Sequence, residues 1–428
     1  MAILKSARMF YGEYPEVSHM TSNTTLNSPC VALAMLSLAF WSNAEPRVFA
    51  SGDHATGTRT RMVVCSGKVD DHAVVYLVDT GASGSAVDER ILHSLKIAPV
   101  RSRSGITPSG AITVREYAPV RMEFGGLPPK SVQPVGLDFS RIAAAPLIPF
   151  NAIAGLDVLS DHVLVVSNGI VSLRTTAPLQ LDVQQEFRTG PDAVDTTMIP
   201  VSVPRLNLSQ ISIDTGESEA CRLEKQHVAI LRKNRLVLPG PEIHVANLKG
   251  AKRIQCLILR EMTLGGVTFR NVPLIEANDN AIGLGILRHL ELVLDFPHHR
   301  IVVSKAHRDT VDYFPQDASG VRVAFDQTGL LRVTSVLSNS SASNLGIHVG
   351  DEVLQLQDKR SAELPIREID EILAQDGRTI PVRLRREGEE FEIQLPLKLP
   401  FQYPPNWESI DKDTEGFERF LKEQESMP

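Results

Sequence analysis

The stretch "AVVYLVDTGASGSAV" (residues 73–87) carries a run of apolar and β-branched residues into the tripeptide Asp-Thr-Gly, at Asp79. The run predicts a buried β-strand. A buried carboxylate without a partner is costly or takes up a proton. Asp79 is therefore either an ordinary strand-ending turn residue or the partner of another group in the chain. The sequence repeats itself at "ISIDTGESEA" (211–220), where a second apolar strand ends in Asp-Thr-Gly, at Asp214.

Two more blocks follow each Asp-Thr-Gly in the same order. The first is "MEFGGLPPKSVQPV" (122–135) in one copy and "MTLGGVTFRNVPLI" (262–275) in the other. The second is "AIAGLDVLSDHVLVV" (152–166) and "AIGLGILRHLELVL" (281–294). Three ordered blocks at similar spacing indicate an internal repeat. Each copy predicts short strands, Gly and Pro turns and one short helix, at "LDVLSDHV" and "LGILRHLE".

The repeat predicts two related β units with a pseudo-two-fold axis, at 60–180 and 195–306. The axis would bring Asp79 and Asp214 together. Two adjacent carboxylates cannot both ionise cheaply, so the pair holds one proton between them. The ionised member can take a proton from water while the other hydrogen-bonds the carbonyl that the water attacks. The pair titrates as a unit, so neither role is assigned to one residue.

The neighbours of the two aspartates suit this chemistry. The glycines allow a tight turn and free N–H groups, the threonine hydroxyls could lock the two loops together, and the serines could hydrogen-bond a carboxylate from outside. These supporting residues are Thr80, Gly81, Ser83, Thr215, Gly216 and Ser218.

The motifs resemble those of the aspartic peptidases, both pepsin-like and retropepsin-like, and most closely the retropepsin-like group in a single-chain, two-lobed form. "VDTGAS" and "IDTGES" match the family's catalytic loops, and "AIAG" (152–155) and "AIGLG" (281–285) match its second signature. The resemblance implies a mainly β fold of two pseudo-symmetric acid-protease β-barrel lobes. It implies that Asp79 and Asp214 are the catalytic pair, with no metal or organic cofactor. It also implies a β-hairpin flap, best matched by 103–117 with its turn at 108–110, or else a plain surface hairpin; 237–253 is the equivalent in the second lobe.

Glu217 departs from the family pattern, which has a small residue or threonine here, as at Ala82 in the first lobe. A third carboxylate near the pair would raise its apparent pKa and move the working pH upward. The alternatives are that it selects basic side chains in a substrate or that it spoils activity.

The region 319–398 has a different sequence pattern. It resembles a PDZ domain of the bacterial type, which is an α+β fold. "NLGIHVGDEVLQL" (344–356) matches that family's most recognisable stretch. The resemblance implies that a peptide C-terminus adds to an open sheet edge. Its carboxylate loop would be "TGLL" (328–331), with Gly329, Leu330 and Leu331 as the peptide-binding residues. The alternative is a small β domain that only packs on the protease, and 399–428 reads as a polar tail.

Bulk composition limits the remaining possibilities. The chain has 428 residues and a formal net charge of -7, and nothing in it favours a nucleic-acid partner. The apolar run 31–41 is shorter than the roughly 20 residues of a transmembrane helix and suits a signal peptide within 1–44. We therefore expect export to the periplasm or the extracellular space, with membrane association if the segment stays uncleaved. Cys221 and Cys256 could form a disulfide, but buried free thiols fit equally.

The sequence as a whole predicts an exported aspartic endopeptidase, a hydrolase of peptide bonds in peptides or unfolded proteins, with a PDZ module that binds protein C-termini. The rival is a catalytically inactive scaffold that keeps the fold, with Glu217 disabling the pair and the PDZ module binding the partner. A third possibility is transpeptidation or self-processing.

Overall fold

The computed structural model describes most of the chain between residues 62 and 399. The described residues are 48–50, 62–107, 110–124, 127–139, 150–167, 170–174, 183–190, 197–247, 250–304, 309–313, 318–326, 329–337, 340–364, 366–399, 407, 415 and 419. The predicted signal peptide and almost all of the polar tail lie outside them. Across this described part, no helix has the length and apolar character needed to cross a membrane.

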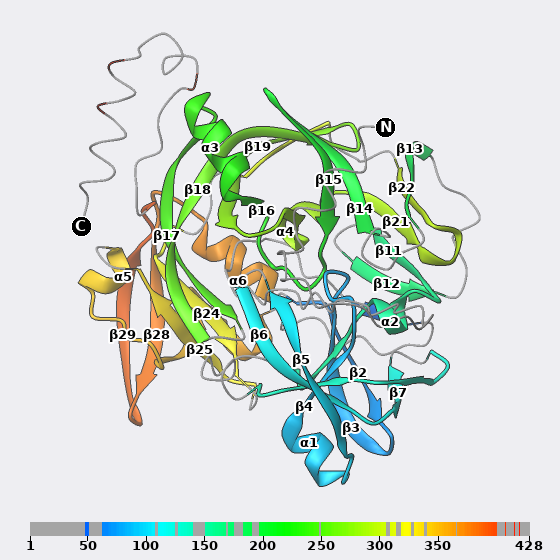
Figure 1. Cartoon of the computed structure of the whole chain (residues 1–428). Coiled ribbons are helices and arrows are strands. Elements are labelled where there is room, and N and C mark those ends of the chain that lie inside the picture. The colour runs from blue at the N-terminus through cyan, green and yellow to red at the C-terminus, as the bar shows by residue number, and fades with distance from the viewer. Residues whose placement is uncertain are drawn as a thin grey trace, which may run out of the picture. The chain divides into compact units, whose positions relative to one another are not determined.

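The first repeat folds into a nine-stranded sheet in the order β5-β6-β9-β4-β10-β3-β2-β7-β8. Figure 1 labels its strands β2 to β7. Helix α1 (Glu89–Ser94) begins where the side chain of Asp88 accepts a hydrogen bond from the N–H of Arg90. The strands are β2 (Val64–Val69), β3 (His72–Val78), β4 (Ala86–Asp88), β5 (Pro99–Thr107), β6 (Gly110–Tyr117), β7 (Val120–Phe124), β8 (Lys130–Val132), β9 (Val135–Leu137) and β10 (Ala152–Ala154).

The second repeat folds into an eight-stranded sheet in the order β17-β18-β14-β15-β20-β16-β19-β23. Helix α3 (Lys225–Lys233) covers it and buries Val228 and Leu231. The strands are β14 (Met198–Val203), β15 (Leu206–Ile213), β16 (Cys221–Glu224), β17 (Val237–Asn247), β18 (Gly250–Leu264), β19 (Val267–Ala277), β20 (Ala281–Ile282) and β23 (Thr310–Asp312).

The two sheets share the strand pairings around the Asp-Thr-Gly loops. β3 runs parallel to β10, which lies antiparallel to β4, and β4 runs parallel to β9. In the second sheet β15 runs parallel to β20, β20 lies antiparallel to β16, and β16 runs parallel to β19. The prediction of a mainly β fold is confirmed, and the sequence repeat corresponds to a repeat of strand pairing.

A six-stranded sheet, ordered β1-β12-β11-β21-β22-β13, takes strands from both repeats. β11 pairs antiparallel with β21, so the backbone hydrogen bonds of this sheet join the two units. Its strands are β1 (Val48–Ala50), β11 (Val163–Ser167), β12 (Ile170–Arg174), β13 (Val183–Arg188), β21 (Glu291–Asp295) and β22 (Arg300–Ser304). A continuous apolar core includes buried residues of both units.

The helix prediction for each repeat needs correction. Helices α2 (Leu156–Leu159) and α4 (Leu284–Leu287) are short, because the apolar residues that follow each one form β11 and β21 instead. The β-branched run at 163–166 favours an extended backbone, and pairing across the two units stabilises it. A second helix in each repeat, α1 and α3, was missed.

Residues 318–399 form a separate sheet with its own apolar core, in the order β24-β25-β26-β28-β29, with β27 paired to β26. Helix α6 lies between β27 and β28, and the turn between β28 and β29 lies at Glu387 and Gly388, which both have positive φ. The elements are β24 (Val321–Phe325), β25 (Leu331–Val336), α5 (Ser341–Asn344), β26 (Glu352–Leu356), β27 (Lys359–Arg360), α6 (Ile366–Leu373), β28 (Thr379–Arg386) and β29 (Glu389–Pro396). We call this region the C-terminal module.

Candidate active site

Each Asp-Thr-Gly loop begins at the carboxyl end of a central strand. Asp79 follows β3, and its N–H donates to the carbonyl of Ala154 at 3.0 Å. Asp214 follows β15, and its N–H donates to the carbonyl of Ile282 at 2.9 Å. Because β10 and β20 carry the second sequence signature, this signature supplies the hydrogen bonds that fix both aspartates.

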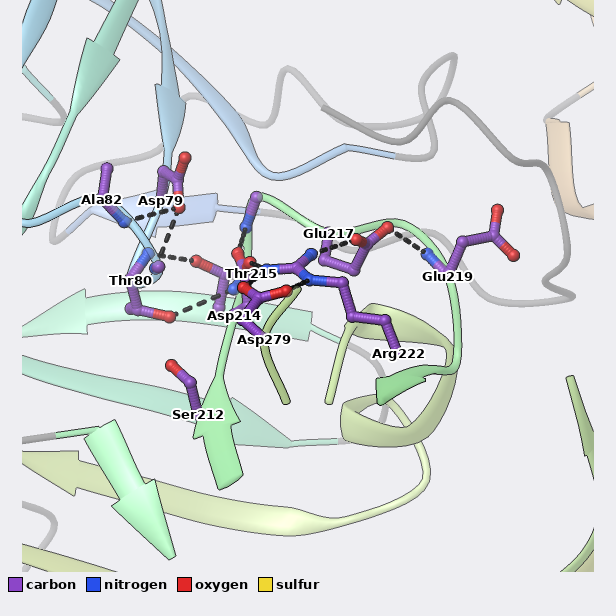
Figure 2. A network of polar contacts seen from close by, with 12 residues as sticks. Asp79, Thr80, Ala82, Ser212, Asp214, Thr215, Glu217, Glu219, Arg222 and Asp279 are labelled. Atoms are coloured by element: carbon purple, nitrogen blue, oxygen red, sulfur yellow. Dashed lines mark hydrogen bonds and ion pairs between the residues drawn. The ribbon is translucent and has the colours of Figure 1, made fainter. Parts of the chain in front are cut away.

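The two loops are joined by the threonine side chains (Figure 2). The Thr80 hydroxyl donates to the carbonyl of Ile213 at 2.7 Å and accepts from the N–H of Thr215 at 3.0 Å. The Thr215 hydroxyl donates to the carbonyl of Val78 at 2.8 Å and accepts from the N–H of Thr80 at 3.1 Å. This reciprocal set is the one that the sequence predicts for the two threonines, and we call it the threonine lock.

The lock places each carboxylate against the opposite loop. A Cβ added to Gly81 would lie 2.5 Å from Cγ of Asp214, and one added to Gly216 would lie 2.5 Å from Cγ of Asp79. Only glycine leaves room for such an approach. The loop N–H groups also hold the aspartates: Asp79 Oδ1 accepts from Gly81 and Ala82, and Asp214 Oδ1 accepts from Gly216.

Both aspartates are fully buried. Desolvation raises the pKa of Asp79 well above its ordinary value, and the negative charge of Asp214 raises it further. Asp79 Oδ2 is buried, and within the described residues no protein group hydrogen-bonds it. Burial and the neighbouring carboxylate therefore favour the protonated form of Asp79, which suits a shared-proton acid–base pair.

Arg222 is the part of this site that the sequence analysis missed. Its guanidinium donates to Asp214 Oδ2 at 2.7 Å and also contacts the carboxylate of Glu217. Nε donates to Oδ1 of Asp279 at 2.9 Å and Nη2 to Oδ2 at 3.1 Å, so Asp279 fixes the orientation of the guanidinium. A signal existed in the sequence: "ACRLE" places a charged residue in a strand whose other central positions read as core.

Glu217 lies on the far side of Arg222 from Asp214 (Figure 2), and its side chain is fully buried. Its Oε1 accepts from the N–H of Glu219, and its Oε2 contacts Arg222. A buried, paired carboxylate cannot reach a basic side chain of a substrate in this arrangement. Desolvation raises the pKa of Glu217 to about 7, although the charge of Arg222 opposes the rise.

Replacement of Glu217 by Gln is expected to change how stability depends on pH. The carboxyl has a pKa near 4.5 when exposed and about 7 when folded, so between these values the folded protein holds a proton that the unfolded chain has lost. The free energy of unfolding of the wild type therefore falls as pH rises through this window. Between pH 5 and pH 8, we expect the free energy of unfolding of the wild type to fall by about 2 to 3 kcal/mol more than that of Glu217→Gln.

Urea denaturation at both pH values measures this difference. Glu389→Gln, at an exposed position, is the control and should show no such difference. An equal effect of pH on wild type and Glu217→Gln would contradict a raised pKa at this position.

Glu219 is a second buried acid in the same loop. Neither of its oxygens has a hydrogen-bond partner among the residues described, and burial raises its pKa well above the ordinary value. Burial therefore favours the protonated form of Glu219. Ser83 and Ser218 follow the loop glycines as predicted, and Ser218 is buried, but their bonding to the carboxylates stays a prediction.

The predicted flap hairpin is present as β5 and β6, with Thr107 opposite Gly110 (Figure 1); the predicted tip at Pro108 and Ser109 lies outside the described residues. Tyr117 lies at the other end of the hairpin. It is buried, and its hydroxyl is 3.2 Å from Nε2 of His93. The equivalent hairpin of the second unit is formed by β17 and β18, with Asn247 opposite Gly250.

The predicted carboxylate loop of the C-terminal module is engaged within the module. The N–H of Gly329 donates to the carbonyl of Asp326 at 2.9 Å, and the N–H of Leu330 to the Asp326 side chain at 3.1 Å. Leu331 begins β25, opposite Phe325. A peptide carboxylate would have to displace Asp326 to use the first two donors, so the peptide-binding assignment stays a prediction.

The cysteines are buried free thiols at the three described positions, Cys65, Cys221 and Cys256. The structure therefore shows no disulfide between Cys221 and Cys256. Over the part of the chain that the structure describes, no group of three His, Cys, Asp or Glu side chains is arranged to hold a metal ion.

Comparison with known proteins gives a match for the half of the site that contains Asp79. A comparison with curated proteins finds no match for the chain. A family model described as "Aspartyl protease" matches residues 65–152, which run from β2 to the start of β10 and include the loop of Asp79. Over this range the chain has an aspartyl protease-like fold, to which the second Asp-Thr-Gly unit adds a matching set of strand pairings.

Proposed function

We propose that this protein is an aspartic endopeptidase that hydrolyses peptide bonds through Asp79 and Asp214. The observation that carries the proposal is the threonine lock, which holds two buried Asp-Thr-Gly loops so that each aspartate lies against the glycine of the other. A buried pair of carboxyls with one proton between them can act as base and acid in one step.

The reaction uses a water positioned between the two carboxyls. The ionised member takes a proton from this water as it attacks the peptide carbonyl, and the protonated member donates a hydrogen bond to the carbonyl oxygen. The protonated member then gives its proton to this oxygen, so the product of attack is a neutral tetrahedral diol. The diol collapses when the amide nitrogen is protonated and the C–N bond breaks. No covalent bond to the protein forms at any stage.

Substrates of this site would bind as extended peptides. The hairpin β5–β6 supplies a candidate flap that would close over an extended chain, and backbone hydrogen bonds would hold such a chain with little dependence on its sequence. Unfolded proteins and flexible segments are therefore the expected substrates, and export places the enzyme in the periplasm or the extracellular space.

The C-terminal module is proposed to bind protein C-termini as a PDZ domain. Its separate core, the helix α6 and the exposed Leu330 beside the loop support a peptide-binding role. The alternative is a module that only packs on the protease. The hydrogen bonds from Gly329 and Leu330 to Asp326 favour this alternative, because they occupy the donors that a peptide carboxylate would use.

The rival function is a scaffold in which Glu217 disables the pair. That function needs the Glu217 side chain to obstruct the aspartates, whereas Glu217 is buried and its charge faces Arg222. The geometry therefore favours the peptidase over the scaffold.

The test is digestion of a mixed peptide library by the purified chain from residue 45 onward, between pH 3 and pH 8, with product termini identified by mass spectrometry. The expected result is internal cleavage with a bell-shaped dependence on pH. If the protein is folded and the library peptides stay intact at every pH, the result would support the scaffold function. Cleavage of the chain itself without cleavage of the library would support self-processing.

A further inference from the structure

The two halves of the site share their strand pairings but carry different charges. In the first unit Ala86 pairs with Ile153, and in the second unit Arg222 pairs with Ala281. Ile153 and Ala281 precede the residues whose carbonyls accept from Asp79 and Asp214. Arg222 is therefore the structural counterpart of Ala86.

Glu217 likewise has a small counterpart. The carbonyl of Ala82 accepts from the N–H of Leu156, and the carbonyl of Glu217 accepts from the N–H of Leu284, each at 2.8 Å. The first unit thus has alanine at both positions, and the second unit adds an ion pair. The second loop is also one residue longer, because five positions separate Glu217 from Arg222 and four separate Ala82 from Ala86.

Arg222 hydrogen-bonds one member of the aspartate pair, although its charge also lowers the pKa of Asp79. Arg222 donates to Asp214 Oδ2, and the side chains of both residues are almost completely buried, so water screens the attraction little. The first unit has alanine at the matching position beside Asp79, where no such donor can exist. A cation bonded to one member of a carboxyl pair favours the negative charge on that member.

We propose that Arg222 is a positioning residue that makes the two aspartates unequal: it holds Asp214 as the base and leaves the shared proton on Asp79. The proposal rests on the peptidase function. It assigns roles that the sequence left open between the two residues.

The proton transfers follow from this assignment. Asp214 takes a proton from water as the new C–O bond forms, and the proton of Asp79 passes to the carbonyl oxygen, which gives a neutral diol. In the second step the proton on Asp214 passes to the amide nitrogen, a diol hydroxyl returns a proton to Asp79, and the C–N bond breaks. The enzyme ends with the proton on Asp79, as it began.

Several other titratable groups face Arg222 and Asp214. Glu217 and Asp279 contact the guanidinium, and Asp279 is partly exposed. Cys221, the preceding residue on β16, has a pKa raised to about 12, and burial raises the pKa of Glu219 well above its ordinary value.

The test compares three proteins: the wild type, Glu217→Ala, and the double variant Glu217→Ala/Arg222→Ala. The double variant has alanine at positions 217 and 222, as the first unit has at Ala82 and Ala86. It removes one positive and one negative charge. Circular dichroism and thermal melts establish that each variant is folded. The readout is kcat/KM for a cleaved library peptide as a function of pH.

We expect the acid limb of the double variant to move to higher pH by about 1 to 2 units, the worth of a hydrogen bond to a charged group. The acid limb of Glu217→Ala should not rise, because Arg222 still contacts Asp214 and has lost a competing carboxylate. A purely structural Arg222 would alter melting while both limbs stay in place, and that result would overturn the proposal.

A second measurement decides the proposal without any catalysis. Carboxyl ¹³C NMR of aspartate-labelled protein, assigned with Asp79→Asn and Asp214→Asn, reports which residue holds the proton at pH 6. The expected result is a neutral Asp79 and an ionised Asp214 in the wild type, and two partly protonated carboxyls in the double variant. Equal protonation in the wild type would overturn the proposal. Absence of cleavage with the expected NMR result would reject the peptidase function and leave the assignment of the proton standing.

Discussion

Asp79→Asn and Asp214→Asn are each expected to lower kcat/KM by about 10³-fold or more, because each removes one half of an acid–base pair. Asparagine keeps the size of aspartate and can still accept hydrogen bonds from the loop N–H groups. It cannot take a proton from water, and it cannot supply the acidic proton for the carbonyl oxygen. Since both carboxyls act in one step, the double variant should be hardly worse than either single variant.

The same substitutions separate activity from stability. Burial raises the pKa of Asp79, so the ionised acid destabilises the folded state and Asp79→Asn should be at least as stable as the wild type at pH 8. Asp88→Asn is the matched control: Asp88 is buried and caps α1, and asparagine is an equally good cap. Full activity in Asp79→Asn, or equal loss in Asp88→Asn, would contradict the assignment.

The second large effect is expected from the threonine lock. Thr80→Val and Thr215→Val keep the volume of the side chain, but each leaves a carbonyl and an N–H of the opposite loop without a partner. A buried unpaired polar group costs about 1 to 3 kcal/mol, so each variant should lose about 2 to 6 kcal/mol of stability. Because the lock positions the carboxylates, we also expect kcat to fall by about 10²-fold.

Urea denaturation and peptide cleavage measure the two effects of this change. Thr80→Ser and Thr215→Ser are the controls, since serine keeps the hydroxyl and loses only a methyl group. They should retain most of the activity and stability. Valine variants with wild-type stability would mean that the lock does not hold the loops together.

The Asp-Thr-Gly loops could be predicted because their signals are local and occur twice. An apolar strand that ends in Asp-Thr-Gly, followed by a second signature, gave both aspartates and both threonines. The register of the parallel pairs β3–β10 and β15–β20 then explains why those two motifs belong together. The lengths of α2 and α4 could not be predicted, since the pairing of β11 with β21 that shortens them joins residues far apart in the sequence.

Arg222 shows the limit of reading motifs. Its role depends on the strand register that puts it opposite Ala281, and on Asp279 from the turn before β20. Neither residue belongs to a motif. Glu217 was correctly singled out as unusual, but its effect could not be predicted because the sequence does not show that an arginine neutralises it.

The most direct test of the central claim is cleavage of a peptide in ¹⁸O-labelled water with hydroxylamine present. If water between Asp79 and Asp214 attacks the carbonyl directly, each new C-terminus carries ¹⁸O and no hydroxamate forms. The labelled product should disappear in the Asp214→Asn variant. A hydroxamate product would reveal a covalent acyl-enzyme. That product, or the absence of cleavage at every pH between 3 and 8, would contradict the account.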